Sequence, residues 1–194
     1  MKNLAGLVGL VLGALMVTGA WAAEPVLMAQ DLDRDGYKEA VMVYEDGRIA
    51  RSFLDMNADG KIDMVVSYKN GYRDHAEKDA DADGRTDTWV SYYFTGVPWK
   101  VAEDMNRDGA ADYWTYLKDG RIYKWELDRN LDGKPDVTTD LVQGPGGQTQ
   151  TLVRIHRQMA DDDFDGVYER MQGAHPGRIA ALPQSLAEAL LGAR

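Results

Sequence analysis

The chain has 194 residues, a formal net charge of −10 and no cysteine. The acidic charge argues against nucleic acid as a partner, because the phosphate backbone is bound mainly by cationic side chains. Disulfides and cysteine nucleophiles are excluded, so a small domain of this chain would need another stabiliser, and bound metal is the obvious substitute.

The first 23 residues have the pattern of a secretory signal peptide. Lys2 gives a basic start, residues 4–17 are apolar, and Ala20 and Ala22 form a small-x-small cleavage site. An uncleaved membrane anchor is the alternative, but the apolar stretch is shorter than the ~20 residues that span a bilayer. We therefore expect an exported protein, periplasmic or secreted, with no membrane span after cleavage, and a linker at residues 24–30.

Residues 31–172 are predicted to form a repeat domain, because one acidic sequence motif occurs there six times. Each copy reads Asp-x-Asp/Asn-x-Asp-Gly-x-x-Asp/Glu, and successive copies start 24, 24, 25, 24 and 33 residues apart. Oxygen-bearing side chains at positions 1, 3, 5 and 9, a glycine at 6 and a backbone carbonyl at 7 match the ligand spacing of a calcium loop. The sequence therefore predicts about six bound Ca²⁺ ions.

The predicted metal ligands number five in each copy. The first three copies supply Asp31, Asp33, Asp35, Tyr37 and Glu39; Asp55, Asn57, Asp59, Lys61 and Asp63; and Asp79, Asp81, Asp83, Arg85 and Asp87. The last three supply Asp104, Asn106, Asp108, Ala110 and Asp112; Asp128, Asn130, Asp132, Lys134 and Asp136; and Asp161, Asp163, Asp165, Val167 and Glu169. Copies with Asn at position 3 keep an oxygen ligand but lose one charge, so they are expected to bind more weakly.

The residues after each copy favour strands over helices. A helix–loop–helix calcium site needs Glu at position 12, and no copy has an acid there: the residues are Met42, Val66, Val90, Thr115, Thr139 and Gln172. The first five copies are followed by residues rich in β-branched and aromatic side chains. We expect a short loop that is closed by its ninth residue and leads into a strand.

A turn signal follows the first strand of each of the first four repeats. Asp46-Gly47, Asn70-Gly71 and Asp119-Gly120 are typical of two-residue hairpin turns, and Thr95-Gly96 occupies the same place in the third repeat. A longer Gly/Pro-containing turn is expected at 144–148. The predicted fold is all-β, a repeat array of about five β-hairpins, or ten strands, joined by calcium loops into a meander or curled single sheet. A closed propeller would need more strands.

Pairing the strands outward from the two-residue turns predicts two different faces. One face is apolar and aromatic, with these expected pairs: Val41–Ser52, Val43–Ala50, Val65–Ala76, Trp114–Trp125 and Tyr116–Tyr123, together with Trp89 and Trp99. The other is mixed, with the expected pairs Met42–Arg51, Val66–His75 and Thr115–Lys124, and with Lys100 and three tyrosines nearby.

The C-terminal tail, residues 173–194, departs from the repeat. The glycines and proline of residues 173–177 predict an end to regular secondary structure, and residues 183–191 favour a short amphipathic helix. Repeat arrays need atypical ends, so a capping helix is expected. A docking helix for another protein is the alternative.

Residues 31–169 resemble the tandem Asp-x-Asp-x-Asp-Gly-x-x-Asp proteins exported by bacteria, described as EF-hand-like or thrombospondin type 3-like repeats. The resemblance implies calcium ligands at positions 1, 3, 5 and 9 of every copy. The integrin-type calcium loop, which also lies between strands and ends at position 9, is similar and supports the β interpretation. Thrombospondin type 3 repeats proper carry cysteines, which this chain lacks.

We expect an exported, non-enzymatic calcium-binding protein in which calcium is structural cement for a scaffold or interaction surface. The alternative is a calcium-dependent module that binds polysaccharide or an envelope protein through Trp89, Trp99, Trp114 and Trp125. A hydrolase would need an acid or base outside the loops. The three histidines have no zinc-site spacing, and most carboxylates belong to a loop.

Overall fold

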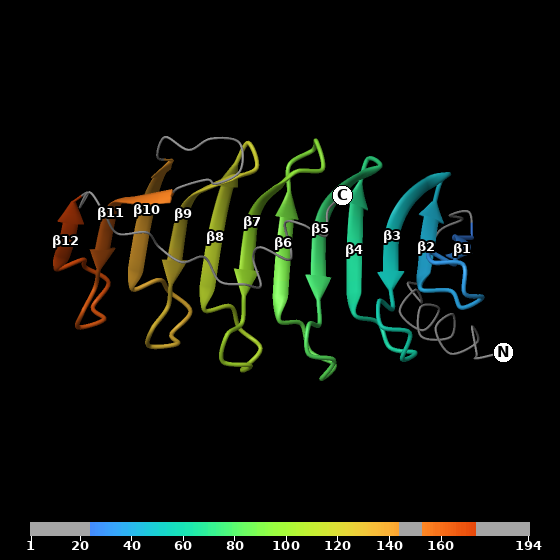
Figure 1. The fold of residues 1–194 in the computed structure, drawn as a ribbon, viewed down its shortest axis with the longest axis horizontal. Helices are drawn as coiled ribbons and strands as arrows, with labels where there is room; N and C mark the ends of the chain where they lie inside the picture. The colour runs from blue at the N-terminus through green and yellow to red at the C-terminus, as the bar shows by residue number, and fades with distance from the viewer. Residues whose placement is uncertain (1–23, 144–152, 174–194) are drawn as a thin grey trace. The chain divides into compact units, whose positions relative to one another are not determined.

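The structure is a computed structural model that describes residues 24–143 and 153–173. This part of the chain forms a single antiparallel sheet of twelve strands, in which each strand lies beside its neighbours in sequence (Figure 1). The sheet is open, because the strand order begins with β1 and ends with β12. The predicted all-β class and the meander order are confirmed. The described residues contain no helix long and apolar enough to cross a membrane.

The strands of the first half are β1 Val26–Gln30, β2 Ala40–Glu45, β3 Arg48–Leu54, β4 Met64–Lys69, β5 Tyr72–Lys78 and β6 Thr88–Tyr92. Those of the second half are β7 Pro98–Glu103, β8 Tyr113–Lys118, β9 Arg121–Leu127, β10 Val137–Gln143, β11 Val153–Ala160 and β12 Arg170–Gly173. The chain divides into two compact units between Trp114 and Thr115, inside β8. We describe each unit by itself.

The linker expected at residues 24–30 is largely a strand. β1 pairs with β2 along its whole length, from Val26 opposite Tyr44 to Gln30 opposite Ala40. It pairs with one edge of β2, a strand in which Val41 and Val43 are 0% and 1% exposed. With β12, which pairs with β11, this brings the sheet to twelve strands rather than about ten. The expected signal peptide, the turn at 144–148 and the C-terminal helix lie outside the described residues.

The first hairpin turns as expected but then contains a bulge. Asp46 and Gly47 have φ values of 50° and 75°, as in the type I′ turn that Asp-Gly favours. The pairs at both ends of the hairpin are fixed, because Glu45 lies opposite Arg48 and Ala40 opposite Leu54. β2 has six residues and β3 has seven, so one residue of β3 is left over and the register shifts between Val43 and Tyr44.

This bulge makes the predicted pairs of the first hairpin wrong by one residue. Val43 lies opposite Arg51 rather than Ala50, and Val41 lies opposite Phe53 rather than Ser52. The second hairpin shifts in the same way between Ser67 and Tyr68. Extrapolating from the turns therefore assigned the return strands to the wrong faces.

The corrected register gives the first unit one buried row and one polar row. The buried row of successive cross-strand partners is Met42, Ser52, Val66, Ala76, Val90 and Val101, and its members from Ser52 onward are 1–8% exposed. The opposite face carries the row Val43, Arg51, Ser67, His75, Ser91 and Lys100. The core of the first unit is thus mainly a line of small side chains. On the opposite face, Val41 and Val43 are also buried, and the cations lie on the strands that follow.

The strand registers place three of the four tryptophans that the sequence assigned to one aromatic face. Trp89 lies between Glu77 and Ala102 on the neighbouring strands. Trp99 falls at the register shift of the next hairpin and has no partner residue in the β6–β7 register. In the second unit, Trp125 lies opposite the buried Thr139.

Candidate metal centres

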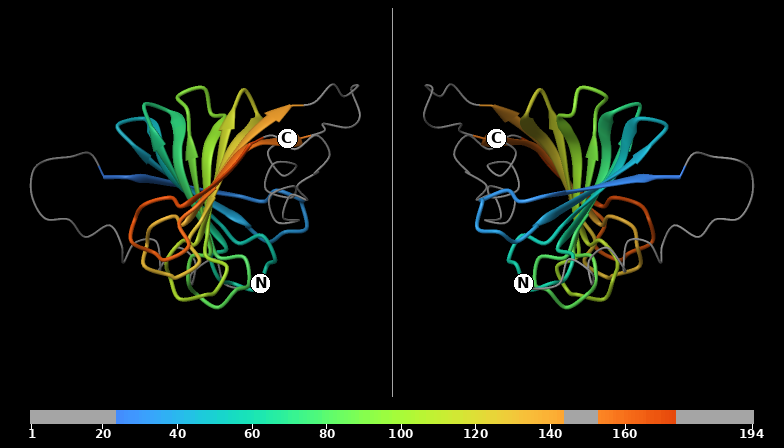
Figure 2. Two further views of the ribbon diagram at one scale, coloured as in Figure 1. Left: turned by 90° about the vertical axis from the view of Figure 1, so that its left-hand side faces the viewer. Right: turned by 90° about the vertical axis from the view of Figure 1, so that its right-hand side faces the viewer.

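Four of the six acidic copies connect successive hairpins, the first joins β1 to the first hairpin, and the last joins the fifth hairpin to β12. We number them loop 1 to loop 6 in chain order: residues 31–39, 55–63, 79–87, 104–112, 128–136 and 161–169. The first unit holds loops 1–4 and the second holds loops 5 and 6. Within each unit, the loops leave the strands at the end opposite the tight turns, as the side views show (Figure 2).

All six loops share one backbone conformation. The fourth residue has a positive φ, between 59° and 69°, although none of the six is a glycine. The glycine at position 6 has φ between 85° and 97°, a range that L side chains rarely adopt. These two residues coil the chain tightly enough for side chains two residues apart to face one centre.

The hydrogen bonds of the loops repeat with the same period. In every loop, the first residue accepts from the glycine amide, at 2.7–3.1 Å. The third accepts from the fifth amide at 2.8–3.3 Å, and the fifth accepts from the seventh amide at 2.8–2.9 Å. The ninth accepts from the second amide at 2.5–3.0 Å. All predicted side-chain ligands therefore belong to one ordered network in each loop.

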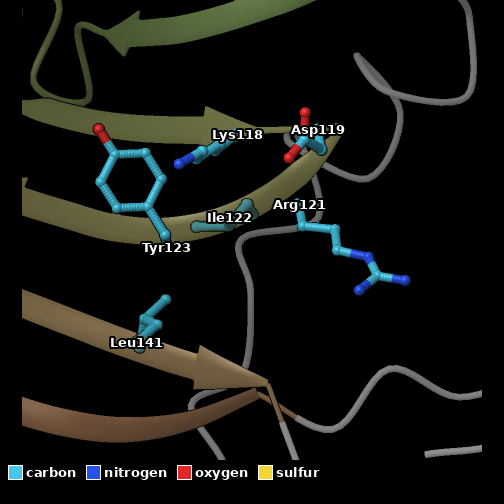
Figure 3. A pocket seen from close by; sticks show the side chains of 6 residues that line it. All are labelled: Lys118, Asp119, Arg121, Ile122, Tyr123 and Leu141. Atoms are coloured by element: carbon cyan, nitrogen blue, oxygen red, sulfur yellow. The ribbon is translucent and has the colours of Figure 1, made fainter.

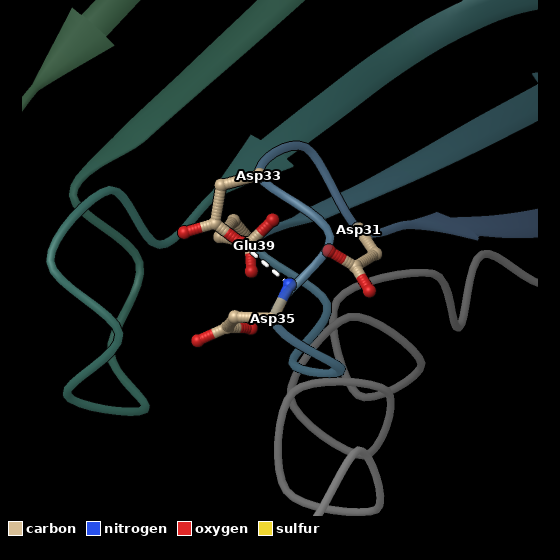
Figure 4. A group of neighbouring side chains, drawn as sticks. All are labelled: Asp31, Asp33, Asp35 and Glu39. Atoms are coloured by element: carbon tan, nitrogen blue, oxygen red, sulfur yellow. Dashed lines mark hydrogen bonds between the residues drawn. The ribbon is translucent and has the colours of Figure 1, made fainter.

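Four of the loops bring acids close enough to share an ion. Oxygens of Asp31, Asp33, Asp35 and Glu39 in loop 1 all lie within 4.8 Å of one another, and Figure 4 shows these side chains on the loop that leads into β2. The same holds for Asp161, Asp163, Asp165 and Glu169 in loop 6, for Asp79, Asp81 and Asp87 in loop 3, and for Asp104, Asp108 and Asp112 in loop 4. Two oxygens bound to one Ca²⁺ at about 2.4 Å can be at most about 4.8 Å apart.

The remaining predicted ligands lie in the same loops but outside these groups. Asp83 does not join the loop 3 group, and the acids of loops 2 and 5 give no group of three among the described residues. Asn57 and Asn106, at position 3 of loops 2 and 4, donate to the ninth carboxylate at 3.4 Å. The position 7 residues are fixed through their amides, whereas their predicted role uses the carbonyl.

In loops 2, 4 and 5 the carboxylates at both the first and the ninth position are buried. Asp55 and Asp63 are 0% and 7% exposed, and Asp104 and Asp112 are 8% and 4% exposed. Two unit charges 4.8 Å apart repel by about 3.5 kcal/mol at an effective dielectric constant of 20. Clustered buried carboxylates therefore favour a bound cation.

Loop 3 contains a buried oxygen with no hydrogen-bond partner. Oδ1 of Asp79 is buried and accepts no hydrogen bond within the described residues, whereas Oδ2 accepts from Gly84 at 2.8 Å. In loops 1, 4, 5 and 6, the equivalent oxygen accepts from the fourth amide. Buried polar atoms are nearly always paired, so this oxygen fits a site that a metal ion would complete.

Neighbouring loops are joined by their backbones. The amide of Asp55, the first residue of loop 2, donates to the carbonyl of Glu39, the last residue of loop 1, at 2.8 Å. Asp79 and Asp104 repeat this bond to the loops before them, and Asp161 repeats it to Asp136 in the second unit. The last residue of each of these loops is therefore bonded directly to the first predicted ligand of the next loop.

Side chains that are not themselves predicted metal ligands add contacts between loops. Tyr37 donates to the Asp55 carboxylate at 2.5 Å, and this bond raises the pKa of Tyr37 to about 12. Arg107 forms an ion pair with Asp81 of the preceding loop at 3.0 Å. In the second unit, Arg129 donates to the carbonyl of Asp161 at 2.5 Å and lies 5.4 Å from the ring centre of Phe164. The sequence analysis missed these contacts, although a basic or aromatic residue at position 2, 4 or 7 was the available signal.

A separate hollow of about 380 Å³ lies at the β8–β9 turn of the second unit (Figure 3). Its lining comprises Lys118, Asp119, Arg121, Ile122, Tyr123 and Leu141. It includes none of the predicted metal ligands, so the acidic loops are the stronger candidates for a functional site.

The sequence matches no protein-family model and no curated protein. One similar solved chain belongs to the crystal structure of accessory secretory protein 1, 2 and 3 in Streptococcus pneumoniae. The two share 15% identity with a TM-score of 0.42, and the match covers 58% of this chain and 20% of that chain. A similarity of this size supports no conclusion about function.

Proposed function

We propose that this protein is an exported, non-enzymatic calcium-binding repeat protein in which about six Ca²⁺ ions hold successive loop–hairpin units together. The sheet would then serve as a scaffold or interaction surface. The observation that carries the proposal is the convergence of three or four carboxylates to within 4.8 Å in single loops. In loop 4 the first and ninth residues of this group are both buried.

The choice of calcium follows from the type and number of ligands. Each loop offers carboxylate or amide oxygens and a seventh carbonyl, with no histidine or cysteine. Ca²⁺ accepts six to eight oxygens in flexible geometry, whereas Mg²⁺ requires a compact octahedron. We expect dissociation constants of roughly 0.1–1 mM, as in extracellular calcium modules, with the weakest binding in loops 2, 4 and 5.

The structural role follows from the links between loops. A lone sheet has little core with which to resist the repulsion of clustered carboxylates. Each occupied site stabilises the folded state by about 1.4–2.7 kcal/mol at 10 mM calcium, for the affinities given above. Six such sites give a total comparable with the entire stability of an ordinary domain, so calcium binding would be coupled to folding.

The test is circular dichroism of the protein in EDTA and in 10 mM calcium. In EDTA the repeat region should lose much of its β-structure and its near-ultraviolet tryptophan signal, and calcium should restore both cooperatively. Raised NaCl should restore part of the signal by screening, and magnesium should act poorly. An identical melting temperature in EDTA and in calcium would rule out the role as cement.

A carbohydrate- or envelope-binding module is less well supported. That alternative depends on tryptophans sharing one face. Trp89 lies between Glu77 and Ala102 on the neighbouring strands, and Trp99 lies at a register shift where it has no partner residue on β6. Tryptophan fluorescence titrated with cell-wall or polysaccharide fragments in calcium would detect such binding. A saturable change would revive this alternative.

A further inference from the structure

The two edges of the sheet correspond to two halves of one repeat unit. In each interior unit, the strand that leaves a loop pairs with a return strand that leads into the next loop, as β2 pairs with β3. At one edge, β12 leaves loop 6 and has only β11 as a neighbour in the described sheet. At the other edge, β1 leads into loop 1 and, among the strands of residues 24–143 and 153–173, has only β2 as a neighbour. β12 therefore corresponds to the first strand of a repeat unit, the one that leaves a loop, and its return strand is missing. β1 corresponds to a return strand, and the first strand of its unit is missing.

From this correspondence we infer that copies of the chain associate head to tail, with β12 of one copy pairing antiparallel with β1 of the next. The interior units define the register. The residue after each loop lies opposite the residue before the next loop, as in Ala40–Leu54 and Met64–Lys78. The same rule places Arg170 opposite Gln30 of the second copy. Gln172 then lies opposite Met28 of that copy.

Exposed apolar side chains at both edges support this pairing. Val26 and Met28 in β1 are 61% and 53% exposed, and Met171 in β12 is 69% exposed. Interior members of the row that Met28 begins, such as Ser52 and Ala76, are 4% and 1% exposed. β1 also has no charged residue and no proline within its five residues, although natural edge strands usually carry such protection against pairing.

The loops next to these edges have complementary charges. Within the first unit, Arg107 at position 4 of loop 4 pairs at 3.0 Å with Asp81 at position 3 of the preceding loop. Loop 1 also has an arginine at position 4, Arg34, but no loop precedes it in the repeat array. In the inferred assembly, loop 6 of the neighbouring copy precedes loop 1 and offers the exposed Asp163 at position 3. Arg34 and Asp163 would form the pair that Arg107 and Asp81 form within the chain.

A second copy fits both edges better than an unrelated strand would. It supplies the matching half-unit, the register and the arginine–aspartate pair together. The interface joins two different surfaces, so each added copy leaves one free edge of each kind and assembly can continue. The inference depends on the sheet register and does not depend on which ion the loops bind.

Cysteine cross-linking tests the register directly, because the chain has no cysteine of its own. The Asp55 amide bonds to the Glu39 carbonyl, and hydrogen-bonded and non-hydrogen-bonded pairs alternate from there along an antiparallel ladder. The Met42–Ser52 position, which Gln172–Met28 would repeat, is therefore a non-hydrogen-bonded pair. Cα atoms in such pairs are about 4.5 Å apart, which a disulfide can bridge.

The experiment mixes two variants, Met28→Cys and Gln172→Cys, each expressed from the full sequence and purified in calcium. Mild oxidation should give mainly the mixed dimer on a non-reducing gel. Leu27→Cys is the matched control, because its side chain points to the other face of β1 and should cross-link poorly with Gln172→Cys. Sedimentation velocity of the unaltered protein should show a mass that rises with concentration. Arg34→Glu should weaken this association about two- to five-fold at low salt.

Several results would overturn the inference. Homodimers of Met28→Cys alone would indicate β1–β1 pairing instead. A disulfide within a single Met28→Cys/Gln172→Cys chain would show that the two edges meet in one molecule. A monomer at all concentrations up to about 100 µM would show that the edges are covered or inert, whether or not the cysteine variants fold.

Discussion

Replacing Asp112 with asparagine separates the charge of a predicted calcium ligand from its shape. Asp112 closes loop 4, is 4% exposed and accepts from the amides of Met105 at 3.0 Å and Asn106 at 3.2 Å. The amide oxygen of asparagine can accept both of these bonds. Asp112→Asn therefore preserves both backbone hydrogen bonds and loses only the 3.4 Å bond from the Asn106 side chain, while it removes one negative charge from the cluster.

The size of the effect follows from the distances within the loop. The oxygens of Asp104, Asp108 and Asp112 lie within 4.8 Å of one another. A pair of charges at this distance repels by about 3.5 kcal/mol at a dielectric constant of 20 and by about 0.9 kcal/mol in water. Weaker hydrogen bonds to a neutral acceptor offset about 1 kcal/mol of the relief. Without calcium, Asp112→Asn should therefore leave stability unchanged or raise it by up to about 2 kcal/mol.

Calcium should reverse the sign of this effect. Loss of the closing ligand should raise the calcium concentration at the midpoint of folding about ten-fold, which corresponds to 1.4 kcal/mol. The assay is a calcium titration followed by circular dichroism, with the signal in EDTA as its starting point. Asp46→Asn is the matched control, since it changes a tight-turn residue of the same unit and should leave both values unchanged. If Asp112→Asn lowers the β-structure in EDTA without moving the midpoint, Asp112 is a structural residue and not a ligand.

Two further predictions concern the loop backbone and the half-buried phenol of Tyr116. Ala82 has a φ of 62°, so Ala82→Gly should stabilise the calcium-bound protein by up to about 1 kcal/mol and Ala82→Val should destabilise it, as thermal melts would show; equal melting temperatures would exclude strain at this position. Burial and the 2.6 Å hydrogen bond to Glu126 raise the pKa of Tyr116 above its usual value of 10. Its contribution to stability should therefore be complete below pH 10 and lost as pH rises through the higher folded-state pKa. Absorbance titrations in calcium of the native protein and Tyr116→Phe should differ only above pH 10, and a difference centred at pH 10 would contradict this prediction.

The loops were the most predictable part of the molecule. Their spacing in the sequence indicated the convergence of Asp31, Asp33, Asp35 and Glu39, because a tight loop with fixed ligand positions is a local structure. The strands after the loops could be predicted equally well, because β-branched and aromatic residues follow the ninth position of the first five copies. The Asp46-Gly47 turn was also correctly predicted.

The faces of the sheet were not predicted because they depend on both ends of each hairpin at once. Counting outward from the turn assigns Ala50 to Val43, whereas the loop end requires Arg51 there. The sequence did contain the signal: six residues separate Glu39 from Asp46, and seven separate Gly47 from Asp55. Unequal strand lengths between two fixed ends require a bulge.

The edge strands and the contacts between loops were missed for a different reason. Val26–Gln30 is short and precedes the first acidic copy, so no repeat signal marks it as a strand. The contact of Tyr37 with Asp55 spans eighteen residues and depends on two loops lying side by side. Such contacts follow from the assembled sheet and not from any local pattern.

Calcium stoichiometry tests the central claim most directly. Equilibrium dialysis of the purified protein against ⁴⁵Ca²⁺, up to about 10 mM calcium, should give about six bound ions per chain, with loops 1, 3 and 6 filling before the Asn-containing loops 2, 4 and 5. Excess magnesium should displace little of this calcium. Binding of one ion or none would contradict the account.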